Sequence, residues 1–79
     1  MNSVWVVYRY RDYRKENDAE ILGVYRKEET ARKAWRQFVE EYIEGDWEGN
    51  TVFEEKNFIN VGDDDCDIFC IEKKEMIED

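Results

Sequence analysis

Two strands are predicted at the start of the chain from the pattern of apolar and polar positions. Within residues 3–12, Val4, Val6, Tyr8 and Tyr10 alternate with Trp5, Val7, Arg9 and Arg11, so the second set begins apolar and ends in arginine. Period-two alternation of this kind is typical of a strand whose two faces meet different surroundings. Residues 21–26 form a second apolar run. The polar segment 13–19 lies between the two runs and contains Asn17 and Asp18, so it predicts a hairpin.

A helix is predicted after the second strand, because one apolar stripe recurs at intervals of three and four residues. The stripe consists of Ala31, Ala34, Trp35, Phe38, Val39, Tyr42 and Ile43. Glu28 and Glu29 suit the positive N-terminal end of this helix, and Gly45 suits its C-terminal end. Lys27 is a poor N-cap, because its side chain cannot accept hydrogen bonds from the free backbone amides.

The second half of the chain predicts two more strands, over residues 51–61 and 67–73, with a turn at 62–65. The order ββαββ predicts an α+β fold, with a four-stranded, mainly antiparallel sheet and one helix packed on one face. Seventy-nine residues leave room for one domain, so residues 1–79 are expected to fold as a single ββαββ unit.

The segment ILGVYRKEETARKAW, together with the tyrosine-rich opening VWVVYRYRD, carries a family resemblance. It resembles small, mostly uncharacterised phage and bacterial ββαββ domains in which a "GVY" strand runs directly into an acidic helix start. The likeness spans residues 4–43. Those domains usually have Ser or Thr at the position of Lys27, so the cap departs from their pattern. The resemblance implies an accessory protein of phage or bacterial type and carries over no catalytic residue.

Charge is distributed unequally along the chain. Residues 1–39 carry nine basic and six acidic side chains, whereas residues 40–79 carry three basic and fifteen acidic ones. A small domain with such a sequence is expected to have a strongly negative face. The residues predicted to form it and to bind a partner are Glu40, Glu41, Glu44, Asp46, Trp47, Glu48, Asp63, Asp64, Asp65 and Asp67.

This acidic face suggests a phage-type inhibitor that imitates the phosphates of a nucleic acid. Its partner would be a basic nucleic-acid-binding protein, such as a CRISPR nuclease, with the chain lying in the basic groove. The likeness to anti-CRISPR proteins rests on charge alone. The simpler interpretation is that the acidity keeps a small domain soluble and monomeric, without a dedicated partner.

Two further surfaces compete with the acidic face. The helix is expected to leave one face of the sheet uncovered, which would suit a homodimer or a scaffold contact; this surface is predicted to carry Trp5, Val7, Arg9, Arg11 and Tyr25. The segment Tyr8–Lys15 interleaves aromatic and basic residues, as single-stranded nucleic-acid binders do. The net charge of −9 disfavours direct nucleic-acid binding, and the same tyrosines would also serve as core residues.

Catalysis and cofactors are not expected. The chain has no histidine, so a Ser-His or Cys-His pair is impossible, and no glycine-rich phosphate loop occurs. Cys66 and Cys70 would lie about 13 Å apart along a strand, too far for a disulfide, so reduced thiols are predicted. The aspartates at 63–67 lack the spacing of a calcium loop, and no metal is assigned. With no signal peptide or membrane segment in view, a cytoplasmic location is expected, in the bacterial host if the protein is phage-encoded.

Overall fold

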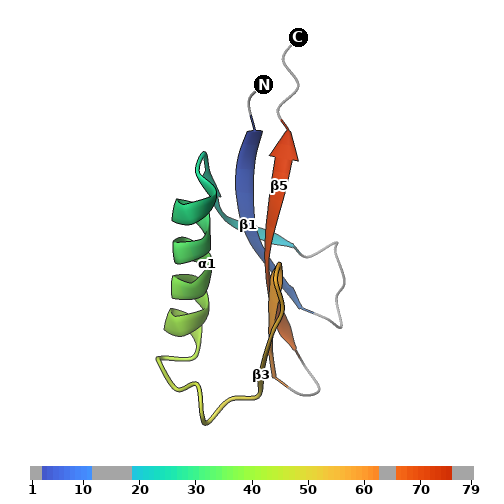
Figure 1. Ribbon diagram of the computed structural model, residues 1–79. Helices are drawn as coiled ribbons and strands as arrows, with labels where there is room; N and C mark the ends of the chain where they lie inside the picture. Colours follow the sequence, from blue (N-terminus) through green and yellow to red (C-terminus); the bar gives the residue numbers. More distant parts are fainter. Residues whose placement is uncertain (1–2, 12–18, 63–65, 76–79) are drawn as a thin grey trace.

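The computed structural model describes residues 3–11, 19–62 and 66–75. Its elements are β1 (Ser3–Arg11), β2 (Glu20–Tyr25), α1 (Glu28–Tyr42), β3 (Val52–Glu54), β4 (Phe58–Val61) and β5 (Asp67–Glu75). The strands form one antiparallel sheet in the order β2-β1-β5-β4-β3, and α1 lies along one of its faces (Figure 1). Within these described ranges, no helix has the length and apolar character needed to cross a membrane.

The predicted α+β class is confirmed, but the sheet has five strands rather than four, so the order is ββαβββ. The error lies in residues 51–61, which were predicted to be one strand. Three consecutive polar residues, Glu55, Lys56 and Asn57, interrupt that run, and the chain reverses there. The amide of Glu55 donates to the carbonyl of Phe58 over 2.8 Å, which joins β3 to β4 as a hairpin.

The helix begins and ends close to where the apolar stripe predicts. Lys27 has an extended backbone and makes no side-chain cap, whereas Glu28 and Glu29 supply negative charge to the first turn. Beyond α1, Glu44 and Gly45 both take positive φ angles, of 55° and 73°. The amide of Gly45 donates to the carbonyl of Glu40 over 2.8 Å, and this bond closes the end of the helix.

The core lies between α1 and one face of the sheet. It consists of Val7, Ala31, Trp35, Val39, Ile43, Ile59, Val61, Phe69 and Ile71. The indole nitrogen of Trp35 donates to the carbonyl of Phe69 over 2.9 Å, so the largest helix side chain buries its area without losing a hydrogen bond. This contact also fixes the position of α1 over β5.

α1 covers the face of the sheet that was predicted to stay uncovered. Val7, expected on the uncovered face, is 0% exposed, and Trp5 and Tyr25 pack against the core. The early part of β1 is apolar at both even and odd positions, so alternation alone did not distinguish its two faces. The pairing of Val7 with Ile71 decides the question, because directly paired residues of an antiparallel sheet share a face.

Candidate interaction surfaces

The face of the sheet opposite α1, here called the open face, is a continuous apolar surface. Cross-strand pairing arranges its side chains in rows, for example Ile21–Tyr8–Cys70–Phe58 and Tyr10–Ile68–Asn60–Phe53. The complete set is Val4, Val6, Tyr8, Tyr10, Ile21, Val24, Phe53, Phe58, Asn60, Ile68, Cys70, Glu72 and Lys74. No described element covers this side of the sheet (Figure 1).

Large apolar side chains on the open face remain exposed to water. Ile21 is 67% exposed, Val24 56% and Phe53 55%. A bulge in β2 opposite Val7 and Tyr8 brings both Ile21 and Val24 to this side, because the pairing register skips Leu22. Since these three side chains lie on the two edge strands, the apolar surface extends across the full width of the sheet.

Aromatic side chains on the open face lie beside one another rather than singly. The rings of Tyr8 and Tyr10 stack with centroids 6.4 Å apart, and those of Phe53 and Phe58 lie 6.3 Å apart. Aromatic residues of this kind are enriched in protein interfaces, because they supply much contact area at a small cost in side-chain entropy. Tyr8 and Tyr10, which were considered as core residues beneath the helix, lie on the open face instead.

Charge is nearly absent from the open face. Among the described residues, its only charged members are Glu72 and Lys74, whose side chains lie 3.7 Å apart near one end of β5. The chain as a whole carries 21 acidic and 12 basic residues. The sheet therefore separates a side of low charge from the side of α1 and its loops, where most of the described charges lie.

The nucleophilic groups on the open face are held in their neutral forms. Burial is the largest cause that raises the pKa of the Tyr8 phenol, and it also raises the pKa of the Cys70 thiol. A thiol with a raised pKa is a weak nucleophile, because the reactive species is the thiolate. Cys66 and Cys70 are both reduced thiols, as predicted. In the described ranges, no group of three Cys, Asp or Glu side chains is placed to hold a metal ion.

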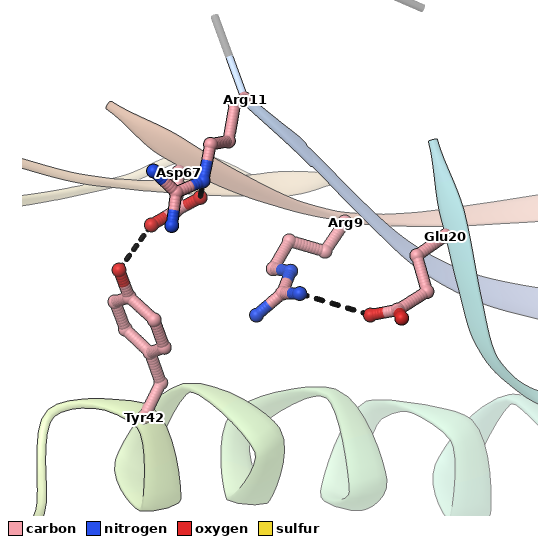
Figure 2. Close-up of polar contacts among 5 residues, drawn as sticks. All are labelled: Arg9, Arg11, Glu20, Tyr42 and Asp67. Atoms are coloured by element: carbon pink, nitrogen blue, oxygen red, sulfur yellow. Dashed lines mark hydrogen bonds and ion pairs between the residues drawn. The ribbon is translucent and has the colours of Figure 1, made fainter. Parts of the chain in front are cut away.

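Asp67 was predicted to bind a partner, and the structure contradicts this because the residue is 3% exposed. Figure 2 shows its carboxylate between the sheet and α1, where it accepts a hydrogen bond from the Tyr42 hydroxyl. Its other oxygen, Oδ1, lies 3.3 Å from Nε of Arg11, an ion-pair distance without a well-aligned hydrogen bond. The bond to Asp67 raises the pKa of Tyr42. This carboxylate joins β5 to α1 and is not available to a partner.

The arginines of β1 point toward α1 and not toward the open face. Arg9 pairs with Glu20 at 2.9 Å and lies over the Tyr42 ring, 5.9 Å from its centroid (Figure 2). Tyr8 and Tyr10 lie on the other side of the sheet. The aromatic and basic residues of this strand therefore lie on opposite faces of the sheet and do not form one surface. Among the described residues, the strand thus offers no combined aromatic and basic surface for a single-stranded nucleic acid. Residues 12–15 of the predicted nucleic-acid site lie outside the described residues.

An acidic cluster surrounds the C-terminal end of α1. Its exposed members are Glu40, Glu41, Glu44, Asp46 and Glu48, so this part of the predicted acidic face is present. The cluster is not purely negative, because the shallow depression beside Glu40 and Glu41 is also lined by Lys33 and Arg36. Asp63, Asp64 and Asp65 lie outside the described residues.

Trp47, predicted as an exposed apolar contact of the acidic face, is half-buried. It packs against the core, and the Arg36 guanidinium lies over its ring, 5.5 Å from the centroid. Arg36 also forms an ion pair with Glu54, one of the acidic side chains of β3. The acidic face is therefore narrower than predicted, since Asp67 is paired within the fold and Trp47 packs against the core.

An open groove of about 820 Å³ lies where β4 ends beside β5. Arg32 lines it from α1 and donates to the backbone carbonyl of Lys56 over 2.9 Å and to the side-chain oxygen of Asn57 over 3.3 Å. Its Nε also bonds Glu28 over 2.8 Å. These bonds tie the first turns of α1 to the β3–β4 hairpin, so the described contacts give Arg32 a structural role.

No family model, curated protein or solved structure matches this chain. What the fold and surfaces define is an α+β domain with one helix, one open apolar sheet face and an acidic cluster at the end of the helix. The likeness to phage and bacterial accessory domains stays a prediction.

Proposed function

We propose that this chain is a protein-binding domain and that the open face is its main binding surface. The observation that carries this proposal is that Ile21, Val24 and Phe53, all highly exposed, belong to one continuous apolar sheet face. Contiguous exposed apolar surface is costly in water, and on monomeric proteins it seldom exceeds a few hundred Å² unless it binds something. No catalytic step forms part of the proposal.

The test is to recover binding partners with the tagged full-length chain from a lysate of the source cells, at about 0.1 M and about 1 M salt. Val24→Lys places a charge on the open face, and Gln37→Lys places the same charge on the exposed side of α1 as a matched control. We expect the partner to bind the wild-type and Gln37→Lys proteins at both salt concentrations and not to bind the Val24→Lys protein. A partner retained equally by all three proteins would refute the proposal.

A second candidate function is supported by the acidic cluster at the end of α1. Glu40 and Glu41 are exposed in the last turn of α1 and Glu44 is exposed just beyond it, which suits a charge-driven contact with a basic groove. On this alternative, the chain is a phage-type inhibitor that imitates nucleic-acid phosphates and blocks a nucleic-acid enzyme such as a CRISPR nuclease. The pairing of Asp67 and Glu54 within the fold weakens it relative to the open face.

The two candidates differ in their response to salt. Labelled duplex DNA bound to a basic nuclease should be displaced by the wild-type chain at low salt, and displacement should be lost as the salt concentration rises. The triple variant Glu40→Gln, Glu41→Gln, Glu44→Gln should fail to displace DNA, whereas Glu29→Gln, Glu72→Gln, Glu75→Gln removes the same charge elsewhere and should retain the effect. Equal displacement by the two triple variants would rule out the acidic cluster as the binding surface.

A further inference from the structure

We infer that the open face binds a second copy of this chain and that two copies pack open face against open face. The inference rests on the proposed function and specifies its partner. The contact is isologous, meaning that the same patch is used on both copies, which is the commonest arrangement in homodimers. The product is a four-layer assembly, with the two sheets in the middle and one α1 helix on each outer side.

The size of the open face approaches what a stable dimer requires. The strands contain 9, 6, 3, 4 and 9 residues. Strand spacing and rise per residue allot roughly 16 Å² of sheet to each residue, which gives a footprint of about 500 Å². Because side chains project from the sheet, the accessible area of the open face is larger than this footprint and approaches the roughly 800 Å² per partner of a standard interface. Two facing sheets bury such surfaces when they pack about 10 Å apart.

The distribution of charge favours a second copy over a charged partner. Among the described residues of the open face, only Glu72 and Lys74 carry charge, and they form an ion pair, so burying this part of the surface leaves neither of the two charges unpaired. The acidic cluster belongs to the end of α1, on the other side of the sheet (Figure 1). A basic partner would find little negative potential on the open face. Another open face offers an apolar surface of the same size.

The outer edge of β5 offers a second route to self-association, and its sequence disfavours that route. Of the residues of β5, β4 pairs with Asp67–Cys70 alone. The segment Glu72–Glu75 therefore has β1 on one side and no strand partner among the described residues on the other. These four residues read Glu-Lys-Lys-Glu, and charged residues of this kind discourage edge-to-edge pairing. Antiparallel self-pairing centred on Lys73 and Lys74 would also place like charges opposite one another.

The decisive experiment measures the mass of the purified full-length chain by analytical ultracentrifugation over a range of concentrations. The monomer mass is 9.7 kDa, and we expect a concentration-dependent rise to twice that value. Because each chain carries a net charge of −9, screening should strengthen the dimer, so Kd should fall when NaCl is raised from about 0.1 to about 1 M. A chain that remains monomeric up to about 1 mM at both salt concentrations overturns the inference.

Variants separate the open face from every other surface. Phe53→Lys and Val24→Lys each place a charge on an exposed edge strand, and Gln37→Lys supplies the matched control on α1. Each substitution lowers the net negative charge, which weakens repulsion between copies, so a weaker dimer can only reflect the charge buried in the contact. We expect Kd to rise at least about tenfold for the two open-face variants and to stay the same or fall slightly for the control. Equal Kd values for all three variants overturn the inference.

Urea unfolding curves of the three variants, recorded at a concentration where all are monomeric, check that each one folds. The failure of the inference differs from the failure of the proposed function. If the purified chain stays monomeric while Val24→Lys still abolishes capture of another protein from the lysate, the open face binds a different partner. If both experiments fail, the open face binds neither and both proposals fall.

Discussion

The assignment of the two faces of β1 is best tested with a pair of neighbouring valines. Val7 is 0% exposed beneath α1, whereas Val6 lies on the open face and is partly exposed. Both belong to the same strand, and Val→Ala is the same chemical change at both positions. Any difference between Val7→Ala and Val6→Ala in the free energy of unfolding therefore reports which face is covered.

The structure predicts a large difference between the two variants. Val→Ala removes two methyl groups, worth about 0.8 kcal/mol each when fully buried, and a residual cavity beneath α1 adds to that loss. We expect Val7→Ala to lower the free energy of unfolding by about 2–3 kcal/mol. Val6 is only partly buried in the monomer, so Val6→Ala should lower the free energy of unfolding by less than about 1 kcal/mol.

The assay is urea unfolding followed by Trp fluorescence, with both variants made in the Phe53→Lys background so that self-association does not add to the stability of Val6. A domain of this size has an m-value near 1 kcal/mol per M, so Val7→Ala should lower the midpoint by about 2–3 M urea and Val6→Ala by less than about 1 M. A loss for Val6→Ala that equals or exceeds the loss for Val7→Ala would show that the face assignment is wrong.

Three further predictions concern stability. Raising the pH above the ordinary pKa values of 9.0 for Cys70 and 10.0 for Tyr8 should destabilise the fold, because burial raises both pKa values and the unfolded chain loses these protons first. The free energy of unfolding should fall by up to about 1.4 kcal/mol per pH unit for each of the two groups. Tyr8→Phe should make this fall with pH less steep, and an equally steep fall in Tyr8→Phe would contradict the prediction. Lys27→Ser should add about 1 kcal/mol in urea unfolding, since the extended backbone at Lys27 suits a side-chain cap that Lys cannot make. Glu44→Gly should add about 1 kcal/mol by relieving the positive φ angle, and Glu44→Ala, which keeps the strain, should show no such gain.

The local elements of the first half were predictable from the sequence. The apolar stripe through Trp35 and Val39 located α1, because helical spacing is a short-range property that later packing leaves intact. β1 was likewise found by alternation, and β2 by a short apolar run after a polar turn segment. The β3–β4 hairpin was missed, because Phe53, Ile59 and Val61 fit one parity. That fit concealed the break at Glu55–Asn57.

The candidate surfaces were less predictable, since they depend on pairing between distant residues. Asp67 looked like one more exposed carboxylate, and nothing local indicates that Tyr42 and Arg11 enclose it. Arg9 looked like part of a basic surface, but it pairs with Glu20, which lies directly opposite on the neighbouring strand β2. A shift of one residue in the pairing register moves every side chain of a strand to the other face of the sheet. The partners of Asp67 and Arg9 therefore follow from the register and not from composition.

The open face and the acidic cluster compete for the functional assignment, but they do not compete for space. Because α1 and the open face lie on opposite sides of the sheet, a dimer joined through its open faces would leave Glu40, Glu41 and Glu44 exposed on both outer sides. Such a dimer would present two acidic clusters, and a partner with two basic sites would gain from binding both. If both surfaces function, self-association should strengthen with salt while capture of a basic partner weakens. Opposite salt dependences measured on one protein would therefore assign a separate role to each side of the sheet.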